Sequence, residues 1–188
     1  MNIGRGVATT ALIVISIGAC GGDASSDVRG RGLTLDSLPP ASQAGIYDAA
    51  ARAAFELDDP ALSLLLDPRM LPRTIGLAPA GRLSDDVTQE LRRRGTIKGT
   101  CEPALDGGRG TPHCSAELPG YVVRYSPVFA MRGDSTQVYI YAQKYDTRGS
   151  GNSPPLRFER AYQVVRRGDG WRAVREGRIP KEIRGESK

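Results

Sequence analysis

Alternating apolar and polar residues in the C-terminal part of the chain place the strongest constraint on its fold. A period of two is typical of strands that bury one face. The alternation covers four segments: Tyr121–Met131, Gln137–Tyr145, Arg157–Arg167 and Trp171–Glu176. Gly168-Asp169-Gly170 separates the last two segments, and a short glycine-rich connection of this kind is typical of a tight β-hairpin. The pattern predicts a four-stranded antiparallel meander.

Two segments upstream of these strands have the residue pattern of helices. Ser42–Leu57 repeats alanine and aliphatic residues at the spacing of one helical stripe. Ser84–Arg94 begins with a good N-cap, has aspartates in its first turn and arginines in its last, and precedes Gly95. Between them, the apolar run Ala61–Leu66 is compatible with a helical turn or a short strand. Helices followed by a meander predict an α+β fold with the helices packed on one face of the sheet.

The C-terminal hairpin, Tyr162 to Trp171, resembles the closing hairpin of the nuclear transport factor two-like superfamily. That resemblance implies a cone of helices against a curved sheet, often with a pocket between them. The superfamily includes enzymes, binders and dimerisation modules, so the resemblance alone does not give a function.

The length and composition of the chain fit one modest globular domain. It has 188 residues, of which 39% are hydrophobic and 25% charged. We expect a single α+β domain over residues 37–180 and a disordered tail over 181–188. The formal net charge is +5, and Arg157–Lys188 alone holds ten basic and five acidic residues. A basic surface of this kind could bind anionic lipid head groups or acidic polymers, but a solvated, ion-paired exterior is the simpler explanation.

The N-terminus has the pattern of an export signal. Val7–Ile17 is uncharged and too short to span a bilayer, but it has the length of a signal-peptide hydrophobic region. The residues that follow, Ile17-Gly18-Ala19-Cys20, resemble the lipobox of bacterial lipoproteins. The resemblance implies cleavage after residue 19 and acylation of Cys20, with residues 20–36 as the lipidated cysteine and a flexible tether. The alternative is an ordinary secretory signal that a cysteine happens to follow.

The resemblance to lipoproteins also bears on location and partners. Gly21 stands where an aspartate would retain enteric lipoproteins in the inner membrane, so the periplasmic face of the outer membrane is favoured. Two or three acyl chains would hold the chain stably on a membrane. Export makes nucleic acid an unsuitable partner. The sequence assigns no oligomeric state.

The other two cysteines, Cys101 and Cys114, are expected to form a disulfide, because an exported cysteine pair is normally oxidised. A metal site is the alternative. However, His113 is the only histidine, and zinc normally takes four ligands. We therefore expect no bound metal and no cofactor.

No pattern of catalytic residues stands out. Asp134 and Asp146 lie at expected strand ends or turns, where aspartate is common for conformational reasons. His113 lies in a proline-rich loop, and the chain has neither a G-x-S-x-G elbow nor a phosphate-binding loop. We expect no catalytic residue.

Tyrosines are the best candidates for a binding surface. In Gln137–Tyr145, the residues Val138, Ile140 and Ala142 are expected on one side of the strand. Tyr139, Tyr141 and Tyr145 are expected on the other side, where Arg160 or Arg172 would complete a surface typical of interfaces. The alternative is ordinary cross-strand contact between tyrosines on a sheet with two covered faces.

The function that fits these features best is a lipid-anchored envelope protein that acts as a non-catalytic binding or accessory module. Its partner would be an envelope protein or a small ligand. The alternatives are a small-pocket enzyme of the nuclear transport factor two-like type and a purely structural envelope lipoprotein.

Overall fold

A computed structural model describes residues 38–55, 57, 62–71, 81–102, 114–115, 118–131, 134–145, 156–179 and 183. All of them belong to one unit that spans residues 32–188. The expected signal peptide over 1–19, Cys20 and the tether over 20–36 lie outside the described residues. Within the expected tail over 181–188, only Ile183 is described, and its side chain is buried.

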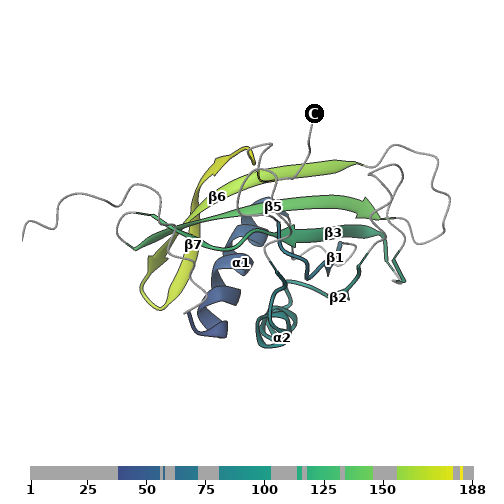
Figure 1. Ribbon diagram of the computed structural model, residues 1–188, viewed down its shortest axis with the longest axis horizontal. Coiled ribbons are helices and arrows are strands. Elements are labelled where there is room, and N and C mark those ends of the chain that lie inside the picture. Colours follow the sequence, from purple (N-terminus) through teal and green to yellow (C-terminus); the bar gives the residue numbers. More distant parts are fainter. Residues whose placement is uncertain are drawn as a thin grey trace, which may run out of the picture. The chain divides into compact units, whose positions relative to one another are not determined.

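In the part of the chain that the structure describes, the elements follow one another as helix, strand, helix and then six strands, as Figure 1 labels them. In chain order they are α1 (Pro40–Ala54), β1 (Ser63–Leu66), α2 (Asp85–Arg93), β2 (Gly99–Thr100), β3 (Gly120–Tyr125), β4 (Phe129–Ala130), β5 (Ser135–Tyr145), β6 (Arg157–Arg167) and β7 (Gly170–Gly177). The expected α+β fold is therefore confirmed.

The sheet is larger and more mixed than expected. Within the described residues, the strands run in the order β2-β1-β3-β5-β6-β7, and β4 pairs with β5. β1 pairs in parallel with both β2 and β3, whereas the other pairs are antiparallel. The prediction of four antiparallel strands was wrong. β1 lies in the apolar run that was compatible with either a helical turn or a short strand. All four of its residues are buried, so it shows no alternation.

The predicted strand Tyr121–Met131 is interrupted where its proline lies. β3 ends at Tyr125, and β4 begins at Phe129. Between them, the Ser126 backbone N–H donates to the Tyr139 carbonyl (3.0 Å), and the Ser126 hydroxyl accepts from the Tyr139 N–H (2.9 Å). Ser126 thus stays bonded to β5 while Pro127 breaks the strand, in line with the irregularity that the proline predicts.

Both helices cover the same face of the sheet (Figure 1). α2 begins as expected, because the Ser84 hydroxyl accepts a hydrogen bond from the Val87 N–H at 3.3 Å. The Tyr47 ring of α1 lies 4.7 Å from the Tyr125 ring of β3, at the centre of the main core. Val138, Ile140 and Ala142 of β5 join this core, which confirms the side predicted for them.

Two smaller clusters lie on the face of the sheet opposite the helices. One contains Leu71, Tyr139, Ala161, Ile179 and Ile183. The other contains Leu65, Cys114, Val122 and Tyr145, with Cys101 beside it. Neither helix among the described residues is long and apolar enough to cross a membrane.

Candidate functional site

Cys101 and Cys114 form the disulfide that the sequence predicted. Cys101 follows β2, and its backbone N–H donates to the Leu66 carbonyl at 2.9 Å. Cys114 is 2% exposed and contacts the face of β1, β3 and β5 that the helices leave uncovered. The disulfide therefore fixes Cys114 onto one end of this face.

The predicted tyrosine surface is only partly assembled. Tyr139, Tyr141 and Tyr145 share the expected side of β5, but Tyr139 and Tyr145 are 9% and 2% exposed. Arg160 is paired in register with Ile140, so it lies on the helix-covered face. There it forms an ion pair with Glu176 and lies 4.9 Å from the Phe158 ring centroid. Of the four residues, only Tyr141 is both half-buried and on the face of the sheet opposite the helices.

Polar side chains surround Tyr141 on the face of the sheet opposite the helices. Arg124 of β3 and Glu159 of β6 are its register partners on either side. The next row pairs Gln143 with Arg157, and the Tyr141 hydroxyl donates to the Gln143 Oε1 atom at 3.3 Å. Arg157 is exposed, and the other four side chains are half-buried. We call Arg124, Tyr141, Gln143, Arg157 and Glu159 the polar strip.

Arg124 is held in place by a buried ion cluster. The Asp67 carboxylate is 0% exposed and accepts two hydrogen bonds from the Arg69 guanidinium, at 2.8 and 2.6 Å. The Arg124 Nε atom lies 3.6 Å from the same carboxylate and donates to the Arg69 carbonyl at 3.1 Å. Burial lowers the pKa of Arg124. The pKa of Arg69 is raised, because Arg69 donates hydrogen bonds to Asp67. Asp67 therefore orients a partly desolvated cation at the edge of the polar strip.

Two exposed leucines lie at one end of the polar strip. Leu118 is 44% exposed, and its carbonyl accepts from the Tyr145 hydroxyl at 2.6 Å. Leu156 is 62% exposed and directly precedes Arg157. An aromatic ring, two arginines and flanking apolar side chains make a surface suited to contact with another macromolecule.

Only one of the three candidate acid–base residues lies within the described part of the chain. Asp134 is exposed in the connection before β5, and Asp146 and His113 lie outside the described residues. In the part of the chain that the structure describes, no group of three or more histidine, cysteine or carboxylate side chains could hold a metal ion.

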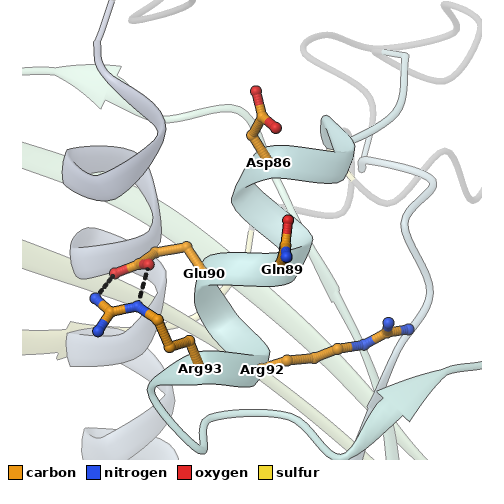
Figure 2. A pocket seen from close by; sticks show the side chains of 5 residues that line it. All are labelled: Asp86, Gln89, Glu90, Arg92 and Arg93. Carbon is orange, nitrogen blue, oxygen red and sulfur yellow. Dashed lines mark hydrogen bonds and ion pairs between the residues drawn. The ribbon is translucent and has the colours of Figure 1, made fainter.

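A shallow depression of about 500 Å³ lies on the exposed side of α2, lined by Asp86, Gln89, Glu90, Arg92 and Arg93. Figure 2 shows Glu90 and Arg93 facing each other, whereas Arg92 points away from them. The Glu90 carboxylate accepts from Arg93 at 2.7 Å and from Arg94 at 2.9 Å. These charges therefore stabilise the last turns of α2 rather than form a binding site.

Replacing Glu90 with glutamine is expected to weaken the acid dependence of stability. Hydrogen bonds and charge from Arg93 and Arg94 lower the pKa of Glu90 to about 2, from its usual value of 4.5. The ionised carboxylate thus stabilises the fold fully above pH 4.5, and this contribution is lost as the pH falls from 4.5 to 2. Urea unfolding midpoints measured over this range should fall less steeply for Glu90→Gln than for the native chain. Parallel curves would show that the ion pairs contribute nothing.

Comparison of the chain with protein-family models, with curated proteins and with solved structures finds no match.

Sequence reasoning missed four residues of the polar strip: Arg124, Gln143, Arg157 and Glu159. Arg124 and Gln143 occupy positions of their strands that face the same side as Tyr141, so the period of two contains that signal. Placing Arg157 and Glu159 requires the register between β5 and β6, which the sequence does not state. Asp67 is a single aspartate after an apolar run, and nothing local distinguishes it from a turn residue.

Proposed function

We propose that this chain is a lipid-anchored, non-catalytic binding module of the cell envelope. Ile17-Gly18-Ala19-Cys20 supports the anchor through its resemblance to a lipobox, and Gly21 favours the periplasmic face of the outer membrane. The disulfide between Cys101 and Cys114 supports export, because disulfides persist in oxidising compartments.

The observation that carries the binding role is the polar strip on the face opposite α1 and α2. Tyrosine and arginine are the residue types that most often dominate the energy of protein interfaces. The strip presents Tyr141 between Arg124 and Glu159, so a partner can meet a ring and both signs of charge in one row. We infer that the partner is another protein of the envelope.

The resemblance to the nuclear transport factor two-like superfamily is carried forward as a proposal about the fold. Helices on one face of antiparallel strands support it. The space between α1 and the sheet, where that resemblance implies a pocket, is occupied by large side chains such as Tyr47, Tyr125 and Ile140. This occupancy favours a surface-binding role over a pocket enzyme.

Crosslinking in intact envelopes tests the binding role directly. A photoreactive phenylalanine derivative at position 141 should capture one reproducible protein, because the strip faces the partner. The same group at Gln89, exposed on α2, should not capture it. Capture of the same proteins from both positions would contradict the assignment of the strip.

Tyr141→Ala measures the contribution of the ring to this interface. We expect the Tyr141→Ala chain to recover about tenfold less partner than the unsubstituted chain, or still less. A loss of this size is typical of a central aromatic residue in an interface. Tyr141→Phe, which keeps the ring and loses only the hydroxyl, should retain most of the recovery. If alanine and phenylalanine behave alike, the ring itself does not carry the binding.

The anchor has a separate test. Cys20→Ser removes the thiol that would carry the lipid, so we expect the chain to move from the membrane fraction to the soluble fraction of lysed cells. A Cys20→Ser chain that stays in the membrane as firmly as the native form would disprove the lipoprotein assignment, whatever the crosslinking shows.

A further inference from the structure

The β6–β7 hairpin gathers three arginines on one face of the sheet. Arg172 is paired with Val165 and Arg175 with Gln163, and residues 163, 165 and 167 of β6 share one face. Residues 172 and 175 would face opposite sides in a regular strand. A register shift opposite Gln163 and Val164 inserts one extra residue, Val174, and brings both arginines to the same side.

These three residues, Arg167, Arg172 and Arg175, are called the hairpin arginines. All three are exposed, and no ion pair joins them to another side chain within the described residues. The acidic residues closest to them along the strands are Asp169 in the turn and Glu176, which is engaged with Arg160 on the opposite face. The hairpin therefore presents uncompensated positive charge.

The hairpin is also firmly positioned. Trp171 of β7 contacts the helix-covered core and lies against Gly45 of α1, where an added Cβ atom would come within 2.8 Å of the Trp171 Cδ1 atom. Val174, the extra residue of the shifted register, is 45% exposed and lies between Arg172 and Arg175 in the sequence. A fixed array of charges binds with a smaller loss of conformational entropy than a flexible one.

We propose that the hairpin arginines bind the anionic surface of a lipid bilayer. The guanidinium groups would contact lipid phosphates, which match their planar array of donors. The inference rests on the proposed lipid anchor, which would keep the domain within reach of the bilayer. The arginines would then hold the domain in one orientation on it.

A bilayer fits this array better than an acidic protein does. The three charges lie along one side of a hairpin at the edge of the sheet. A flat anionic surface meets all three at once, whereas a protein needs carboxylates placed to match. The polar strip, with both signs of charge, is the surface that suits a protein.

Vesicle sedimentation tests the proposal without the acyl chains. Every chain carries Cys20→Ser, so residues 1–19 contribute equally to all of them. One set of vesicles contains three parts phosphatidylcholine to one part phosphatidylglycerol, and the other contains phosphatidylcholine alone. We expect preferential binding to the anionic vesicles that is lost at about 0.5 M salt, because salt screens exposed charges.

The test variant carries Arg167→Gln, Arg172→Gln and Arg175→Gln. Each basic residue near an anionic surface strengthens binding roughly fivefold, so the triple variant should lose roughly a hundredfold in partition onto anionic vesicles. The matched control carries Arg92→Gln, Lys98→Gln and Lys144→Gln, which remove the same net charge from exposed positions on other elements. It should stay within about threefold of the parent. Circular dichroism establishes that both variants are folded.

Three outcomes would overturn the proposal. Equal losses in the two triple variants would show a net-charge effect without a site. Equal binding to both kinds of vesicle would show that the head-group charge is irrelevant. If the hairpin variant keeps its vesicle binding but loses a captured protein in envelopes, the arginines serve an acidic protein instead. Membrane fractionation of Cys20→Ser in cells tests the anchor independently of all three.

Discussion

Replacing Asp67 with asparagine is expected to lower the free energy of unfolding by about 3–5 kcal/mol, the range found when one partner of a buried ion pair is removed. The Asp67 carboxylate is fully buried and accepts two hydrogen bonds from Arg69. It also lies 3.6 Å from the Arg124 Nε atom. Without it, the half-buried guanidinium groups of Arg69 and Arg124 keep their charge but lose the carboxylate that both contact. Urea unfolding of the native and variant chains measures the loss.

Glu102→Gln is the matched control for Asp67→Asn. It is the same change from carboxylate to amide, in an ion pair with Arg82. That pair is exposed, at 55% for Arg82 and 43% for Glu102, so solvent replaces the lost interaction and the effect should be much smaller. Equal effects of the two substitutions would show that water reaches Arg124 freely. The Asp67 cluster would then not be the element that orients the polar strip.

The long antiparallel strands could be predicted because their signal is local. More and less buried side chains alternate along most of β5, and Gly168 supplies the positive φ of +61° that the turn between β6 and β7 needs. The start of α2 is equally local, since Ser84 binds an N–H three residues away. In each case the residues that determine the element are next to it in the chain.

β1 and β2 were not predicted because their formation depends on distant partners. The four residues of β1 are buried, so no polar residue marks a face. Their parallel pairing with β3 joins residues that α2 and the disulfide loop separate in sequence. A pattern read within a short window does not contain this information.

In the candidate surface, too, the features set by neighbouring residues were predicted and those set by distant segments were not. The period of two placed the tyrosines of β5 on one face correctly. It did not reveal that Leu71, Ile179 and Ile183 cover Tyr139, because those residues lie on other segments. The prediction for Arg160 depended on the register with β5, and a shift of one residue moves every side chain of a strand to the other face. The extra residue in β7 is another register effect that alternation alone does not show.

Loss of the disulfide is expected to destabilise the fold by about 3 kcal/mol, because the bond closes a short loop and restricts the unfolded chain. The two cysteines are 13 residues apart in sequence. The folded state contributes a second effect, since Cys114 contacts Leu65, Val122 and Tyr145 in a buried cluster. Reduction of the native chain keeps both sulfur atoms and so measures the crosslink alone. Cys101→Ala with Cys114→Ala removes the buried sulfur as well.

Urea unfolding separates these two contributions. We expect the reduced native chain to have a lower midpoint and a steeper dependence on urea, because an unfolded chain without the crosslink exposes more surface. The double alanine variant should unfold at still lower urea. If reduction leaves the midpoint unchanged, the buried contacts of Cys114 hold it in place without the bond.

A loss of about 3 kcal/mol lowers the folded-to-unfolded ratio roughly a hundredfold. Domains of this size are commonly stable by only about 5–15 kcal/mol. A stable fold would then depend on an environment that keeps the disulfide oxidised.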